Sequence, residues 1–246
     1  TSSTSATSRS STVATSPTVT GMPPAGRFPT STKPPLPGTL KGLTHGTVHR
    51  TSLLRRDYRY RGLSLSDKDP AFQPELTLTH KSGVYVGFWG STLADNGGED
   101  IETDVMIGYS REFGPVSVDV NAMWYLYPGA SQDNYLELTG RLSAGIGPAE
   151  VGATFSYAPS QDQIGNISNR YYMVDASVPL PSTPLMLSGS FGIEDGAFGD
   201  KKQDWSLGVS AEISHFTLGV AYIDSARTGG DPLGKATAVA SLSAHF

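Results

Sequence analysis

The stretch AVASLSAHF, residues 238–246, ends the sequence with a regular alternation of apolar and small polar side chains. Because neighbouring side chains of a β-strand point to opposite faces, Ala, Leu and Phe share one face here, and Ser and His share the other. A chain end usually frays unless other elements hold it. The stretch therefore predicts a strand that pairs with another strand and helps to close a sheet.

The same alternation recurs from about residue 50 onward, and the connections between the alternating segments differ in length. The connections FGP at 113–115 and SH at 214–215 are short. By contrast, PGASQDN at 128–134 and EDGAFGDKKQD at 194–204 are long and polar. Tight turns at one rim and long loops at the other are typical of outer-membrane barrels. We therefore predict an all-β fold, an antiparallel transmembrane β-barrel of about 12 strands in the bacterial outer membrane.

The composition excludes several other classes of protein. The 246 residues carry a formal net charge of −5 and include no Cys, which excludes a disulfide framework and a thiolate metal site. No apolar run reaches the roughly 18 residues of a transmembrane helix. The basic residues are scattered, so nucleic acid is not an expected partner. The sequence begins without the basic and apolar regions of a signal peptide, as expected of a processed chain.

Residues 1–46 differ in composition from residues 47–246, which the alternation assigns to the barrel. Fourteen of the first twenty residues are Ser or Thr, and such a segment has too little apolar surface to fold alone. Its charged residues are all basic: Arg9, Arg27, Lys33 and Lys41. We interpret it as an extended arm with two open roles. It either plugs its own acidic barrel or contacts neighbouring barrels, which would build a homo-oligomer or a lattice.

The polar face of the predicted strands is rich in charged residues, and in a membrane barrel this face lines the lumen. The residues expected to line it are Arg55, Asp57, Arg59, Arg61, Glu75, Glu102, Asp104, Asp119, Glu137, Arg141, Asp175 and Glu212. Arg59 and Arg61, placed on a first strand at 53–65, are expected to pair with acids across the lumen. Two interpretations stay open: a selectivity lining of charged side chains, or a salt-bridged network that fills a narrow lumen.

Aromatic residues gather near the strand ends that lead into the long loops. Amphipathic rings settle at membrane–water interfaces, so these residues predict an aromatic girdle. Its expected members are Trp89, Trp124, Tyr127, Tyr157, Tyr172, Trp205 and Tyr222. Phe246 lies at the opposite, short-turn rim, where we expect it to act in barrel assembly. An even number of strands places both barrel ends at this rim, which is expected to be periplasmic, and membrane lipid and lipopolysaccharide are expected partners.

Four motifs make the chain similar to the TorF porin family of proteobacterial outer membranes. They are DYRYRGLSLS at 57–66, WGS at 89–91, YPGASQDNYLEL at 127–138 and DWSLGVS at 204–210. The resemblance covers roughly residues 50–246. It implies a small outer-membrane barrel and passive permeation. The Ser/Thr/Pro-rich arm departs from the pattern of that family.

The histidines and the acidic loops are the residues that could carry catalytic or metal-binding chemistry. His80, His215 and His245 fall near the short-turn rim and follow no nucleophile motif, so no enzyme is predicted. The carboxylates of DKD at 67–69 and DNGGED at 95–100 suit Ca²⁺, but they lack the ligand spacing of an EF-hand. Solvated acidic loops are the preferred interpretation, and no cofactor is expected.

The sequence is compatible with three functions. The first is a small porin or channel for small solutes or ions, assembled as a homo-oligomer through the arm. The second is a structural outer-membrane protein that forms an ordered lattice and whose closed barrel is filled by salt bridges. The third is a soluble β-sandwich, which would bury its apolar strand faces.

Overall fold

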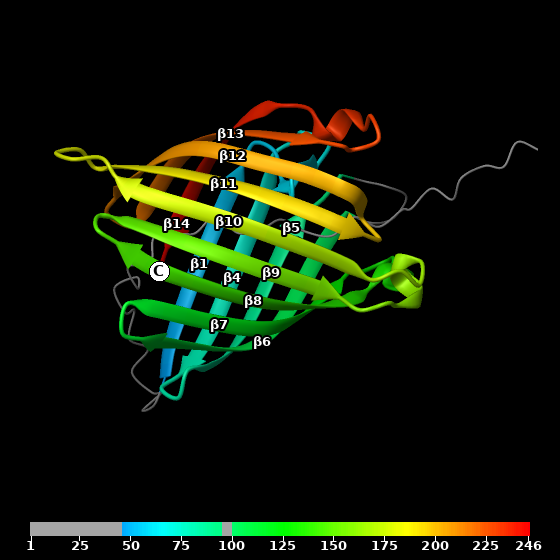
Figure 1. Ribbon diagram of the computed structural model, residues 1–246, viewed down its shortest axis with the longest axis horizontal. Coiled ribbons are helices and arrows are strands. Elements are labelled where there is room, and N and C mark those ends of the chain that lie inside the picture. Colours follow the sequence, from blue (N-terminus) through cyan, green and yellow to red (C-terminus); the bar gives the residue numbers. More distant parts are fainter. Residues whose placement is uncertain (1–45, 95–99) are drawn as a thin grey trace, which may run out of the picture.

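The computed structural model describes residues 46–94 and 100–246, so the arm predicted over 1–46 lies outside the described residues except for Gly46. Twelve wall strands close into a single antiparallel barrel (Figure 1). They are β1 (Gly46–Arg55), β4 (Ala71–His80), β5 (Val84–Thr92), β6 (Ile101–Phe113), β7 (Val116–Leu126), β8 (Tyr135–Ile146), β9 (Ala149–Ala158), β10 (Asn169–Pro179), β11 (Leu185–Gly196), β12 (Gly199–Ile213), β13 (Phe216–Ala226) and β14 (Thr237–His245). The predicted twelve-stranded barrel is confirmed.

Closure of the barrel depends on pairing between its first and last strands. β1 and β14 run antiparallel, with Thr51 opposite His245. The backbone N–H of Phe246 donates to the carbonyl oxygen of Arg50 at 3.0 Å, so pairing continues past the end of β14. The predicted role of the terminal stretch as a closing strand is therefore confirmed, and the wall leaves no open sheet edge.

The first wall strand is shorter than the segment 53–65 predicted from the sequence. β1 ends at Arg55, and the chain then leaves the wall. Inside the barrel, β2 (Arg59–Tyr60) and β3 (Leu63–Ser64) pair only with each other. The alternation of this segment is therefore that of a separate hairpin, and its predicted place in the wall is wrong.

The turn of this hairpin explains why the wall strand cannot continue. Arg61 has a φ of 43° and Gly62 a φ of 85°, both in the left-handed region. Two successive left-handed residues make a tight hairpin turn, which reverses the chain at once. A Cβ on Gly62 would also collide with the side chains of Ser225 and Asp204, so glycine is required here.

The connection predicted as a long loop at 194–204 is mostly strand. β11 runs to Gly196 and β12 begins at Gly199, which leaves a turn of two residues. Three of its polar residues face the lumen: Glu194, Lys202 and Asp204 are buried there, and Lys202 Nζ lies 2.5 Å from Glu194 Oε2. Polarity in this segment therefore has two sources: a charged interior, and exposed residues such as Asp200 and Lys201 near the turn.

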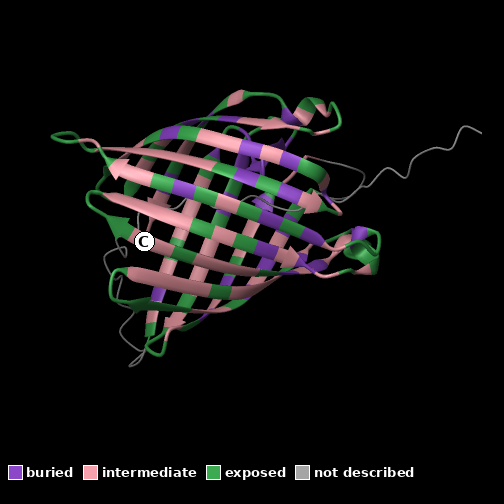
Figure 2. Ribbon diagram, viewed as in Figure 1, coloured by how far each residue is buried: buried purple, intermediate pink, exposed green. Residues whose placement is uncertain are grey.

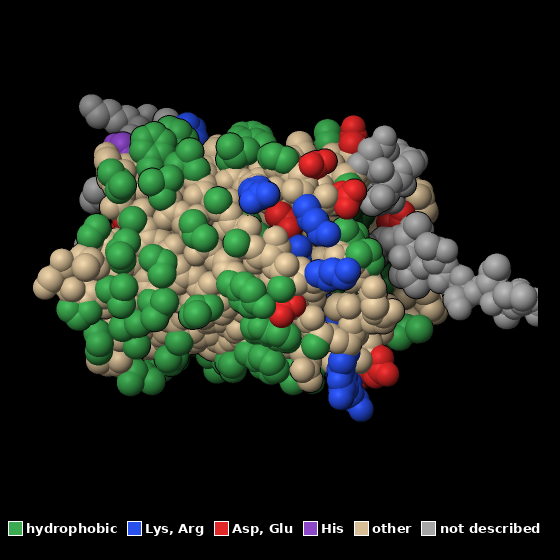
Figure 3. All heavy atoms as spheres, turned by 90° about the horizontal axis from the view of Figure 1, so that it is seen from above, with side chains coloured by type: hydrophobic (Ala, Val, Ile, Leu, Met, Phe, Trp, Pro, Cys, Tyr) green, Lys and Arg blue, Asp and Glu red, His purple; other side chains and the backbone are tan. Residues whose placement is uncertain are grey.

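The side chains of the barrel are distributed in the reverse of a soluble protein. Large apolar residues project outward, and Leu207 and Val220 are each 58 % exposed. Inside, Glu102, Glu137 and Glu194 are fully buried. Exposed and buried residues alternate along the wall strands (Figure 2), and the charged side chains on one face gather near one end of the barrel (Figure 3). A soluble β-sandwich buries apolar side chains between its sheets, so this distribution contradicts that hypothesis.

Single helical turns occupy three of the connections at the long-loop rim: η1 (Ser131–Asp133), η2 (Asp162–Ile164) and η3 (Pro232–Gly234). Within residues 46–94 and 100–246, no helix has the length and apolar character needed to cross a membrane. Ile164 of η2 packs in an apolar cluster with Tyr127 and Tyr135. This cluster stabilises the long-loop end of the barrel, next to the hairpin inside it.

Candidate functional site in the barrel lumen

Residues 56–70, named the inserted segment below, occupy the lumen at the long-loop end of the barrel. They connect the end of β1 to the start of β4, and Tyr58, Tyr60 and Leu63 are buried. The backbone N–H of Ala94 donates to the carbonyl oxygen of Leu65 at 3.0 Å, which ties the segment to the chain after β5. The segment is a packed constriction, because its own side chains fill the space between opposite walls.

Arg61, at the tip of the hairpin, spans the lumen to two wall strands. Its guanidinium donates to Glu137 of β8 at 2.7 and 2.9 Å and to Glu194 of β11 at 2.6 Å. The same group lies over the rings of Tyr60 and Tyr171, 4.5 and 4.2 Å from their centroids. Burial alone would lower the pKa of Arg61, but Glu137 and Tyr60 raise it well above its ordinary value. Arg61 is therefore a charged clamp between the segment and the wall.

Arg59 is held differently from the sequence-based expectation. Its Nε donates to Asp57 at 2.8 Å, within the same segment. Its Nη1 donates to the carbonyl oxygens of Gly62 at 2.9 Å and Lys235 at 3.0 Å. Asp57 also accepts from the Ser64 hydroxyl at 2.6 Å. Arg59 thus braces the hairpin and joins it to the connection before β14, and the predicted pairing of Arg59 across the lumen is wrong.

Aromatic residues on the wall pack around the base of the inserted segment. Glu102 accepts hydrogen bonds from Tyr58 at 3.1 Å and from Tyr127 at 3.4 Å. The ring of Trp89 lies 5.6 Å from that of Tyr58, centroid to centroid. Trp89 and Tyr127 therefore face the lumen, and their predicted place in the outer girdle is wrong. The other predicted girdle residues face outward: Trp124, Tyr157, Tyr172, Trp205 and Tyr222.

The lumen between the inserted segment and the short-turn rim is named the vestibule. Arg141 of β8 lies here, with its side chain 24 % exposed, and binds Asp175 through two bonds of 2.5 and 2.9 Å. Its guanidinium lies where a Cβ on Gly152 would stand, so this glycine makes room for it. Asp119 is partly exposed and accepts from the Tyr85 hydroxyl at 3.0 Å. The vestibule is therefore charged and partly open.

The remaining residues predicted for the lumen also lie on the inward face of the wall. Arg55 and Asp104 are buried toward the inserted segment. Glu75 is partly exposed and accepts from the Thr77 hydroxyl at 3.2 Å, and Glu212 is exposed at the short-turn rim. The structure thus separates the predicted lining into a buried group and a partly exposed group.

Sequence reasoning missed several residues of the buried group. The sequence pattern places Glu194 and Lys202 in a loop and Asp204 where that loop meets the next strand, yet Glu194 binds Arg61 and Asp204 accepts from the Tyr171 hydroxyl at 3.0 Å. The alternation of polar and apolar residues could have identified them. Lys202 and Asp204 keep the same alternation as the rest of β12, and extending that strand backward would have placed them on the inward face.

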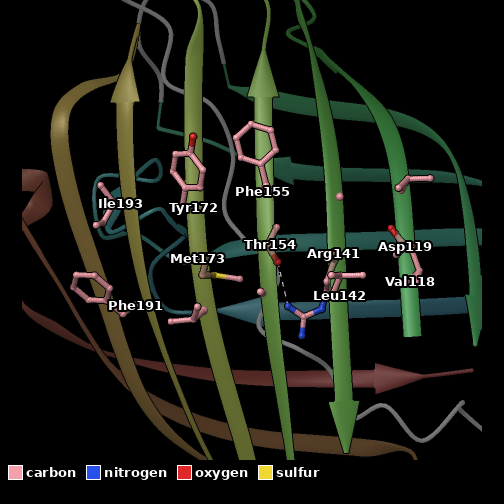
Figure 4. A pocket seen from close by; sticks show the side chains of 14 residues that line it. Val118, Asp119, Arg141, Leu142, Thr154, Phe155, Tyr172, Met173, Phe191 and Ile193 are labelled. Atoms are coloured by element: carbon pink, nitrogen blue, oxygen red, sulfur yellow. Dashed lines mark hydrogen bonds between the residues drawn. The ribbon is translucent and has the colours of Figure 1, made fainter. Parts of the chain in front are cut away.

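A shallow apolar groove of about 560 Å³ lies on the outer wall (Figure 4). It crosses β7 to β11, where Phe155 and Tyr172 stand beside each other on adjacent strands. Gly140 and Ala153 are the small residues that leave the depression between the larger side chains. The large side chains Phe155 and Tyr172 point away from the lumen, whereas Asp119 and Arg141, which also border the groove, belong to the inward face.

Neither the histidines nor the acidic loops form a reactive cluster in the part of the chain that the structure describes. No group of three or more His, Cys, Asp or Glu residues suited to a metal ion occurs within it. Residues 95–99 of the second acidic loop lie outside the described residues. His80 contacts the Ser82 hydroxyl at 2.8 Å in an exposed turn, and His245 contacts the Thr217 hydroxyl at 3.2 Å.

Comparison with known proteins places the barrel among porin folds. A family model described as "Bacterial protein of unknown function (Gcw_chp)" matches residues 45–246. That model does not carry the TorF name, so this finer identification remains a resemblance. A search of curated protein sequences found no match.

Two solved structures illustrate the similarity of fold. A structure described as "KdgM porin" is 8 % identical, with a TM-score of 0.56 over 81 % of this chain and 98 % of that chain. A NanC porin structure is 11 % identical, with a TM-score of 0.55 and the same coverage. A second KdgM structure is described as a complex with disordered oligogalacturonate. At these identities the comparison shows a shared barrel architecture.

Proposed function

We propose that this chain, which belongs to the Gcw_chp family, is an outer-membrane channel for small solutes or ions. The observation that carries the proposal is the inverted barrel, in which an apolar outer face encloses a charged and partly exposed vestibule. Closed strands satisfy their backbone groups internally, as a lipid environment requires. The porin descriptions of the similar barrels support the same function. The proposal includes no enzymatic activity.

The outer face supports a membrane position for the barrel. Trp124 and Tyr172 are exposed near the long-loop end, as an interfacial girdle requires, and the outer groove offers apolar surface to lipid chains. We propose membrane lipid and lipopolysaccharide as its surroundings. The short turns lie at the rim where β1 begins and β14 ends, so we propose that both barrel ends, with Phe246 in barrel assembly, are periplasmic.

A second candidate is a structural barrel without conductance. The inserted segment favours it, because Arg61, Glu137 and Glu194 close the long-loop half of the lumen with buried ion pairs. Under this proposal the barrel is an anchor and forms an ordered lattice. The channel requires that ions can pass the constriction, whereas the structural barrel requires that they cannot.

Insertion of the purified full chain into planar bilayers tests the main proposal. Stepwise conductance, together with a heat-modifiable shift on gels, is the expected result. Electrically silent insertion of a protein that still shows the heat-modifiable shift would contradict the channel and support the structural candidate. A boiled sample of the same preparation is the control for conductance caused by contaminants.

We also propose that the N-terminal arm joins barrels into a homo-oligomer. The support is chemical: the arm carries Arg9, Arg27, Lys33 and Lys41 without any acid, and the barrel is acidic. Deletion of residues 1–45 is expected to dissolve an oligomer of the full chain in detergent, as measured by light scattering. If deletion instead raises conductance and leaves the oligomeric state unchanged, the arm plugs its own barrel and the oligomer proposal is wrong.

A further inference from the structure

We infer that the vestibule makes this channel selective for cations over anions. The inference rests on the proposed function and names the class of solute that passes. It starts from the charges on the inward face of the wall, on the short-turn side of the inserted segment. The net charge of the vestibule depends on which charged side chains share that face and on how far they neutralise one another.

Carboxylates dominate the inward face of the vestibule. Strand alternation and register place six of them there: Glu75, Glu112, Asp119, Glu150, Asp175 and Glu212. Of the Lys and Arg residues that the structure describes, Arg141 is the one whose side chain shares this face. Ordinary Asp and Glu side chains are ionised at neutral pH, so the vestibule carries a net negative charge.

The other Lys and Arg residues on the wall strands and in the inserted segment are directed elsewhere, and Lys81 lies in the exposed turn between β4 and β5 at the short-turn rim. Arg50, Arg111 and Arg170 are exposed on the outer face of the wall. Arg61 and Lys202 are buried at the long-loop end, where both bind Glu194. The excess of acid in the vestibule is therefore a property of that region. It does not merely restate the acidic composition of the chain.

Among the described residues, Arg141 spends its charge on one of these carboxylates. Arg141 directs both of its terminal nitrogens to Asp175, at 2.5 and 2.9 Å, and a third bond to the Thr154 hydroxyl at 3.2 Å. Asp119 accepts its bonds from the Tyr85 hydroxyl and the Asn121 amide, which are neutral donors and add no positive charge. Within the described part of the lumen wall, Glu112, Asp119 and Glu212 therefore keep the vestibule negative after Arg141 has bound Asp175.

A narrow lumen strengthens the effect of this charge on passing ions. Walls of low dielectric constant focus the field of lining charges into the water between them, which raises the local concentration of cations and lowers that of anions. Rings of Asp and Glu are the usual lining of cation-selective pores. Salt screens such a field over about 10 Å at 0.1 M and about 3 Å at 1 M, so the selectivity should weaken at high ionic strength.

The test is the reversal potential of the purified full chain in planar bilayers under a KCl gradient. We expect a reversal potential of the sign given by K⁺ permeation at about 0.1 M salt, with a smaller value near 1 M. The double variant Glu112→Gln, Glu212→Gln removes two exposed rim carboxylates without touching a buried contact. It should lower the ratio of K⁺ to Cl⁻ permeability several-fold. Asp162→Asn, an exposed acid in η2 at the other rim, is the matched control and should change nothing.

The outcomes separate this inference from the proposed function. Conductance with no ion preference, or with a preference for Cl⁻, overturns the selectivity and leaves the channel intact. A double variant that is as selective as its parent also overturns it, because the vestibule carboxylates would then not set the selectivity. Failure of every form to conduct overturns the channel itself, and the inference falls with it.

Discussion

The two halves of the lumen use the same kinds of side chain in opposite proportions. At the long-loop end, Arg61 meets Glu137 and Glu194 in a buried clamp. At the short-turn end, Arg141 stands among several carboxylates that are partly exposed. Charge that is buried has to be paired to be tolerated, whereas charge that stays hydrated does not. The difference indicates that the first half holds the constriction in place, and it agrees with the proposal that the second acts on ions in solution.

The largest effect expected from this comparison comes from Arg61→Ala. The substitution leaves Glu137 and Glu194 buried after loss of their shared partner, a change that typically costs about 3–5 kcal/mol. The midpoint of the heat-modifiable gel transition should fall sharply. Arg61→Lys keeps the charge but loses the forked geometry of the guanidinium. The stability of this variant should therefore lie between that of Arg61→Ala and that of the unmodified protein. A normal midpoint for Arg61→Ala would contradict the clamp.

Gly62→Ala tests the turn of the inserted segment and should have the next largest effect. Its φ of 85° and the nearby Ser225 and Asp204 side chains leave no room for a methyl group. We expect a loss of about 2 kcal/mol in unfolding free energy, from strain and displacement together. Gly114→Ala is the matched control, since Gly114 has a φ of 63° but an open surrounding, and strain alone should cost about 1 kcal/mol there. Equal losses at both sites would contradict the packed turn.

Arg141→Gln should change ion flow more than stability. The Arg141 side chain is 24 % exposed but that of Asp175 only 3 %, so the exchange leaves a buried carboxylate that the Gln amide and entering water must satisfy, and the loss should be about 1–2 kcal/mol. Removing this guanidinium, which alone among the described Lys and Arg residues shares the inward face of the vestibule, should increase the preference for K⁺ in reversal-potential measurements. A reduced preference for K⁺ would contradict the assignment of net charge in the vestibule.

Tyr127→Phe should have the smallest effect. It removes one hydrogen bond to Glu102, 3.4 Å long, while the donor from Tyr58 remains. We expect a loss of about 0.5–1 kcal/mol, measured by urea unfolding in detergent. Trp124→Phe, on the outer face, is the comparison for a change of aromatic ring without lumen contacts. A larger loss at Trp124 than at Tyr127 would contradict the inward position of Tyr127.

The sequence predicted the barrel well because its signal is local. Alternation identified the wall strands, and the stretch 238–246 indicated the closing strand. The inserted segment could not be recognised in this way, because DYRYRGLS alternates whether it lies in the wall or in a separate hairpin. Only the pair Arg61–Gly62 marked the turn, and its left-handed backbone becomes visible in three dimensions.

The charged residues of the candidate site were only partly predictable for a related reason. Polarity marked Arg59 and Arg61 as inward facing, yet alternation contains no information on which acid lies opposite which base. Glu194 and Lys202 were read as loop residues, since a polar run looks the same in a loop and in a charged lumen. The position of Trp89 along its strand predicts a place in the girdle. Whether it faces lipid or lumen depends on the face of the strand, and its ring packs against Tyr58 in the lumen.

The central claim is that the inserted segment closes one half of the lumen while the other half selects ions. The most direct test is the single-channel conductance and reversal potential of a variant in which residues 58–65 are replaced by a short Gly/Ser turn. A retained heat-modifiable shift shows that the barrel still folds. The account predicts a higher conductance with an unchanged preference for K⁺, because the vestibule carboxylates remain. An unchanged conductance, or loss of the preference together with the segment, would contradict it.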